Sequence, residues 1–137
     1  MQKEARGQQT RDGIRLFQEV DFVGMRAAGK LAAQILDEIS DEVVVGQTTG
    51  EIDKMIEQKV TAAGAQSATI GYKGYRHASC ISLNHVVCHG IPGDKKLKDG
   101  DILNIDVTVI VDGWYGDTSR MFIAGKLDRK SERLIQV

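Results

Sequence analysis

The sequence ILNIDVTVIVDGWYGDTSRMFI, residues 102–123, determines how the second half of this chain folds. Its first ten residues alternate, with apolar side chains at every odd position, which is typical of a β-strand with one buried face. The Asp112-Gly113 pair then favours a two-residue hairpin turn, because both residues tolerate a positive φ. The segment therefore predicts two antiparallel strands, Ile102–Val111 and Trp114–Ile123.

This turn also predicts which residues lie opposite one another. Asp106 should pair with Ser119 and Thr108 with Asp117, so that all four side chains share one face. Asp106 and Asp117 are then diagonal neighbours, roughly 7 Å apart. Carboxylates this close repel unless a proton or a cation lies between them, and oxygen ligands suit a pair of Mn, Co, Fe or Zn ions. The alternative is that Asp117 begins a turn and Asp106 hydrogen-bonds to Thr108 or Ser119.

The first half of the chain has the period of helices instead. Apolar residues recur at three- and four-residue steps between Phe17 and Ile39, which predicts an amphipathic helix. A capping box at Thr48 and Glu51 introduces a second apolar stripe, which ends at Gly64.

A second hairpin is predicted between Ala78–Leu83 and Val86–His89, with Asn84-His85 as its turn. In that register Cys80 faces His89. A histidine there could bind a substrate or transfer a proton, and a core histidine satisfied by the backbone is the alternative. Two helices followed by two hairpins predict an α+β fold, with the helices covering one face of an antiparallel sheet.

Composition and charge argue against several classes of protein. The 137 residues carry a net charge of -1, from 18 Lys+Arg and 19 Asp+Glu, which removes the electrostatic case for a nucleic-acid partner. No apolar run approaches the ~20 residues that span a bilayer. Residues 1–16 form a polar arm without the apolar stretch of a secretory signal. Two cysteines are too few for a disulfide framework, so a reduced, cytoplasmic protein is expected. His77 and His85 are expected to be exposed to solvent.

Five segments of the chain resemble the N-terminal half of a type I methionine aminopeptidase. They are Gly71–Tyr75, Ser79–Asn84, Val86–Pro92, Leu97–Val109 and Asp112–Phe122. The resemblance implies the pita-bread fold, in which two pseudo-symmetric α+β halves enclose a two-metal site. It also implies removal of the initiator methionine from new proteins with a small second residue. Nascent polypeptide N-termini would then be the substrates, and the ribosome is one place where the enzyme could meet them.

The resemblance implies roles for seven residues by matching position. Asp106 looks like a ligand of one divalent metal ion (Co, Mn, Fe or Zn), and Asp117 looks like the carboxylate that bridges two such ions. His89 looks like the catalytic histidine that contacts the substrate near the scissile bond. The pocket for the methionine side chain is implied at Tyr72, Tyr75, Cys80 and Thr69, the last at a position where some relatives have cysteine. The two metal ions would lower the pKa of a bound water, whose hydroxide attacks the peptide carbonyl.

The family also needs a histidine and two glutamates from a C-terminal half, and no histidine follows His89 in this chain. We therefore expect residues 17–137 to be the N-terminal half-domain of a longer enzyme, with the C-terminal half missing and the isolated chain inactive. A stand-alone half-domain that acts as a binding or self-assembly module without catalysis is an alternative. A relative of prolidase or aminopeptidase P is another, although the short arm argues against the large N-terminal domain that those enzymes carry.

Overall fold

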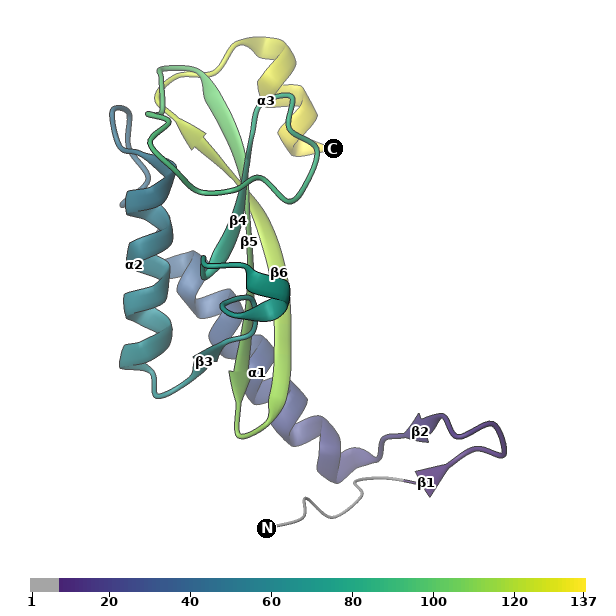
Figure 1. The fold of residues 1–137 in the computed structure, drawn as a ribbon. Coiled ribbons are helices and arrows are strands. Elements are labelled where there is room, and N and C mark those ends of the chain that lie inside the picture. The colour runs from purple at the N-terminus through teal and green to yellow at the C-terminus, as the bar shows by residue number, and fades with distance from the viewer. Residues whose placement is uncertain (1–7) are drawn as a thin grey trace.

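A four-stranded antiparallel sheet lies at the centre of the computed structural model, which describes residues 8–137 (Figure 1). Its longest strands are β5 (Asp101–Val111) and β6 (Trp114–Ala124), which pair along their whole length. β5 also pairs with β4 (Ser79–Leu83) and with the two-residue strand β3 (Gln66–Ser67). Every other strand of this sheet therefore contacts β5.

A two-residue turn joins β5 to β6, as the sequence predicts. Asp112 and Gly113 have φ values of 49° and 81°, in the left-handed region that such a hairpin turn requires. The opposed pairs match the predicted register: Asp106 with Ser119 and Thr108 with Asp117.

Two helices cover one face of the sheet. α1 (Glu19–Glu38) packs on β5 and β6, and α2 (Thr49–Ala62) packs on β3 and β4 (Figure 1). The odd-numbered residues of β5 point toward the helices, and each large apolar side chain buried there contributes about 1.5–3 kcal/mol relative to its exposed state. The main side chains of this core are Ile35, Leu36, Ile52, Ile56, Leu103, Ile105, Val107 and Val109. The predicted α+β fold is confirmed.

Glycine allows α1 to lie directly against β6. A Cβ atom on Gly116 of β6 would overlap the backbone of Ala28 in α1, and one on Gly24 would overlap the ring of Trp114. The helix axis can therefore approach the strand more closely than a larger residue at either position would permit.

The predicted capping box begins α2. The Thr48 hydroxyl accepts a hydrogen bond from the Glu51 amide at 3.1 Å, and the Glu51 carboxylate accepts one from the Thr48 amide at 2.7 Å. Gly64, at which the stripe was predicted to end, has a φ of 70° just after the helix. The helix ends because glycine adopts this conformation without the strain of a Cβ.

The predicted hairpin between Ala78–Leu83 and Val86–His89 is wrong. A turn does form at Asn84-His85, since the Val86 amide donates to the Leu83 carbonyl at 3.0 Å. The residues that follow are not a strand, and β4 pairs instead with β5, which places Cys80 opposite Asp106. The physical reason is that His89 has a positive φ of 55°, which takes the returning chain out of the extended conformation. Beyond the turn bond, it makes one further backbone bond to β4, from the Ile81 amide to the Gly90 carbonyl.

The predicted arm, residues 1–16, contains a small exposed hairpin. β1 (Gln8–Gln9) and β2 (Arg15–Leu16) pair antiparallel just before α1. Residues 1–7 of the arm lie outside the described residues.

The chain's last described helix is α3 (Arg129–Gln136), which Asp128 caps by accepting a hydrogen bond from the Ser131 amide at 2.8 Å. None of the helices between residues 8 and 137 is both long and apolar enough to cross a membrane.

Candidate functional site

The two aspartates implied as metal ligands lie on the open face of the sheet, opposite the helices. Asp106 is half-buried on β5, and Asp117 is exposed on β6, where its carboxylate accepts a hydrogen bond from the Thr108 hydroxyl at 3.1 Å. Burial raises the pKa of the Asp106 carboxyl, and the negative charge of Asp117 raises it further, against an opposing effect of His89. The two acids are therefore close enough to influence each other, as the hairpin register predicts.

A pocket of about 550 Å³ brings together the five residues implied in substrate binding. Its lining consists of Thr69, Tyr72, Lys73, Gly74, Tyr75, Cys80, His89 and Ile91. These residues come from three segments: the glycine-rich loop with its short 3-10 helix η1 (Tyr72–Gly74), the strand β4, and the loop that follows β4. The family resemblance implies Thr69, Tyr72, Tyr75, Cys80 and His89 as substrate-binding residues, and these roles stay predictions.

The pocket adjoins the aspartate pair because β4 and β5 are neighbours. Cys80, in the pocket lining, is the direct antiparallel partner of Asp106, so both side chains are on the same face of the sheet. A molecule whose side chain occupies the pocket would place its adjoining atoms next to the Asp106 carboxylate.

The loop after β4 holds His89 in an uncommon conformation. His89 has a φ of 55°, a value rare for a residue with a side chain and concentrated at functional sites. Gly90 beside it is fixed to β4, since its amide donates to the Ser82 hydroxyl at 3.0 Å and its carbonyl accepts from the Ile81 amide at 2.9 Å. These two bonds hold His89 at the edge of the pocket.

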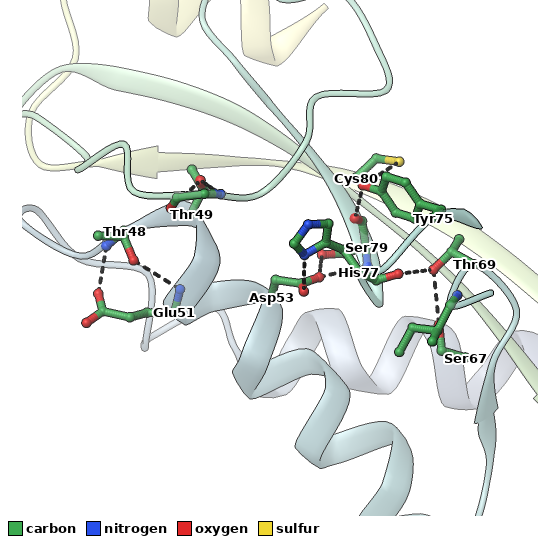
Figure 2. Close-up of polar contacts among 12 residues, drawn as sticks. Thr48, Thr49, Glu51, Asp53, Ser67, Thr69, Tyr75, His77, Ser79 and Cys80 are labelled. Carbon is green, nitrogen blue, oxygen red and sulfur yellow. Dashed lines mark hydrogen bonds and ion pairs between the residues drawn. The ribbon is translucent and has the colours of Figure 1, made fainter. Parts of the chain in front are cut away.

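Sequence reasoning missed a polar network behind the pocket wall, shown in Figure 2. Asp53 of α2 is buried and binds both Ser79 and His77. His77, which was expected at the surface, is therefore half-buried and paired with a carboxylate at 3.2 Å. The signal that could have indicated the network is Asp53 itself, a charged residue inside the apolar stripe of α2, because a buried carboxylate needs partners.

The aspartate pair can supply part of a metal site. Carboxylate oxygens suit divalent ions, and a cation between Asp106 and Asp117 would offset their repulsion. Within residues 8–137, however, no group of three or more His, Cys, Asp or Glu side chains is placed to hold a metal ion. The donor set of the described residues fits two ligands of such a site, and further ligands would have to come from outside them.

The sequence model of metallopeptidase family M24 matches residues 23–137. The chain belongs to this family. It is 55% identical over 124 residues to a methionine aminopeptidase of Rickettsia prowazekii, covering 90% of this chain and 48% of the relative. It is 54% identical over 119 residues to a methionine aminopeptidase of Escherichia coli K12, covering 85% of this chain and 45% of the relative. The chain thus spans about half the length of the curated relatives it matches.

Solved structures of related proteins confirm the fold. The methionine aminopeptidase of Rickettsia prowazekii superposes with a TM-score of 0.88 at 54% identity, covering 90% of this chain and 50% of that one. The methionine aminopeptidase of Thermotoga maritima superposes with a TM-score of 0.85 at 33% identity, again covering 90% of this chain and 50% of that one. A prolidase of Pyrococcus furiosus gives 0.74 at 18% identity, covering 87% of this chain and 34% of that one, which shows a shared fold alone. The predicted resemblance to half of a pita-bread fold is confirmed.

Proposed function

We propose that this chain contributes the side-chain pocket and two metal ligands to a methionine aminopeptidase. The remaining ligands would come from the half of the family's length that the chain does not cover. The observation that carries the proposal is the pairing of Cys80 with Asp106, which joins the pocket to the aspartate pair. The identity of 54–55% to proteins named methionine aminopeptidase supports it over a prolidase, to which the identity is 18%.

The lining of the pocket suits the side chain of an N-terminal methionine. Tyr72, Tyr75 and Ile91 offer aromatic and apolar surface, and the thiol of Cys80 is a soft neighbour for a thioether. An unbranched, flexible side chain can fill such an open pocket, with its backbone next to Asp106.

The polar residues beside the pocket have distinct roles in the proposal. Asp106 and Asp117 would hold divalent ions, which when bound polarise the scissile carbonyl and lower the pKa of a water. His89, fixed at the rim by its neighbour Gly90, would hydrogen-bond the substrate near the scissile bond. The substrates would be nascent proteins with a small second residue, met in the cytoplasm and at the ribosome.

A binding or self-assembly module without catalysis is the second candidate. It is favoured by apolar side chains on the open face, where Tyr115 is 64% and Ile123 is 41% exposed. A partner of any kind could cover such side chains, so the distinction depends on activity.

The test is a fusion of this chain to the C-terminal half of the Escherichia coli relative. With Mn²⁺ or Co²⁺, it should release free methionine from a Met-Ala peptide, and a chelator should stop the release. Asp117→Asn should abolish it. Asp112→Asn is the matched control, because Asp112 lies in the turn at a positive φ that asparagine also tolerates.

Two outcomes would contradict the proposal. Unchanged methionine release by Asp117→Asn would remove the bridging role of that carboxylate. A fusion that is folded and monomeric, but releases no methionine with either metal, would favour the non-catalytic module.

A further inference from the structure

Asp53 is a buried carboxylate that the proposed reaction does not use. It lies on α2, 5% exposed, on the helix face that packs under β4. Its Oδ1 accepts two hydrogen bonds from Ser79, one from the amide at 2.9 Å and one from the hydroxyl at 2.6 Å. Its Oδ2 lies 3.2 Å from Nδ1 of His77 (Figure 2). Asp53 does not itself line the pocket. It binds Ser79 and His77, which lie between the lining residues Tyr75 and Cys80 in the sequence.

Three residues of the pocket lining are linked by hydrogen bonds to Ser79 and His77, the two residues that Asp53 binds. The Tyr75 hydroxyl donates to the Ser79 carbonyl at 2.8 Å, and the Cys80 thiol donates to the Tyr75 oxygen at 3.6 Å. The Thr69 hydroxyl donates to the carbonyl of His77 at 2.7 Å. The rings of Tyr75 and His77 also meet edge to face, 5.4 Å between centroids.

These contacts form one connected path from α2 to the pocket. Within the described residues, every buried side-chain nitrogen and oxygen atom has a hydrogen-bond partner, so the network is complete. Complete buried networks hold their members in one arrangement, because each lost bond leaves a buried polar group unpaired. Replacing the Asp53 carboxylate would remove the hydrogen bonds that hold Ser79 and His77. Tyr75, Cys80 and Thr69 would then be less firmly fixed, because their own hydrogen bonds lead to these two residues.

We propose that Asp53 is a positioning residue that sets the shape of the side-chain pocket, and with it the preference for an unbranched side chain. The inference rests on the proposed function for its substrate, and on the hydrogen bonds of Figure 2 for its geometry. A purely structural role would affect the stability of the chain without changing which side chain the pocket accepts.

The kinetic test uses the fusion with the Escherichia coli C-terminal half and peptides that begin with methionine, norleucine or leucine. Asp53→Ala should raise KM for the methionine peptide about tenfold, as expected for losing a hydrogen bond to a charged group, with a smaller change in kcat. The ratio of kcat/KM between methionine and leucine peptides should fall. Asp53→Asn keeps an acceptor for Ser79 and should restore most of both values. Affinity for Mn²⁺ should not change.

Asp21→Ala is the matched control. Asp21 is another buried aspartate, 7% exposed, and it accepts a hydrogen bond from the Gln18 amide at 2.9 Å at the start of α1. Loss of the Asp21 carboxylate should destabilise the chain but leave KM unchanged. The ratio of kcat/KM between methionine and leucine peptides should also be unchanged. If Asp53→Ala behaves like Asp21→Ala in these two quantities, the inference is wrong. If Asp53→Ala does not fold, Ser79→Ala decides, because unchanged KM and selectivity in that variant would also overturn it.

A second readout uses the 137-residue chain alone and needs no activity. Cys80 is half-buried in the pocket wall, and Cys88 is exposed and serves as the internal reference. Asp53→Ala should increase the rate at which a thiol reagent labels Cys80 relative to Cys88, and Asp21→Ala should not. An equal labelling ratio in all three proteins would overturn the inference. A changed ratio together with an inactive fusion would leave the positioning role intact and reject the proposed function.

Discussion

Cys80 of β4 lies directly opposite Asp106 of β5, so the wall of the pocket and the aspartate pair share one face of the sheet. Side chains opposed in this way start about 5 Å apart. The geometry restricts any ligand of the pocket, since a group extending past Cys80 along the strand pair would lie next to the Asp106 carboxylate. His89, at the same rim, would contact that group from the loop side.

His89→Ala should lower kcat of the fusion by about 100-fold, which is in the range for removing one hydrogen-bond donor near the scissile bond. Affinity for Mn²⁺, measured by calorimetry, should be unchanged, because in the proposed site this chain contributes Asp106 and Asp117 as ligands and His89 is not one of them. His85→Ala is the control, since His85 is an exposed histidine in the turn after β4. An equal loss of metal affinity and turnover in His89→Ala would show that His89 is itself a ligand.

Gly116→Ala should destabilise the 137-residue chain by about 2 kcal/mol, because its Cβ would overlap the backbone of Ala28 and push α1 away from β6. Gly29→Ala, in the same helix, has nothing within 4 Å of the added atom. That variant should be more stable than the wild type by about 0.5–1 kcal/mol, the gain in helix propensity over glycine. Urea unfolding measures both, and equal effects of the same sign would contradict the close approach.

The hairpin of β5 and β6 could be predicted because its information is local. The alternation along residues 102–111 identifies the buried face, and Asp112-Gly113 determines the register, so the shared face of Asp106 and Asp117 follows from adjacent residues. The capping box of α2 is local in the same way.

The partners of β4 and Asp53 could not be predicted because they are distant in sequence. The turn at Asn84-His85 was recognised, but a turn residue does not determine whether the chain after it pairs. The strand that pairs with β4 is β5, which begins 18 residues after β4 ends. Asp53 and His77 are 24 residues apart, and no local period connects them.

The capping box of α2 should make part of the stability depend on pH. The hydrogen bond from the Thr48 amide lowers the pKa of the Glu51 carboxyl below its ordinary value. Because the pKa is lower in the folded state, this contribution is present above the unfolded value of about 4.3 and is lost as the pH falls through the lowered pKa. Glu51→Gln should therefore reduce the loss of stability on acidification, measured by urea unfolding at a series of pH values.

Thr48→Ala is the control for that measurement. It removes the hydroxyl that caps the Glu51 amide, at a cost of about 1 kcal/mol, but keeps the Thr48 amide that Glu51 binds. Its stability should be lower than that of the wild type throughout, with a weaker dependence on acid that does not disappear, because the Thr48 hydroxyl also lowers the pKa of Glu51 but less than the Thr48 amide does. A pH dependence in Glu51→Gln as large as that of the wild type would contradict the assigned hydrogen bond.

The phenol of Tyr75 should remain neutral at a pH at which an unfolded tyrosine ionises. Burial raises the pKa of Tyr75, and the neighbouring Cys80 thiol and Asp53 carboxylate raise it further. With the pKa higher in the folded state, its contribution to stability is complete below about pH 10 and is lost as the pH rises beyond that value. Comparing tyrosinate absorbance of the wild type and Tyr75→Phe should show almost no ionisation of position 75 near pH 10 in the folded chain, and about half ionisation in urea. Equal signals in both states would mean that the hydroxyl is solvated and does not bind the Ser79 carbonyl.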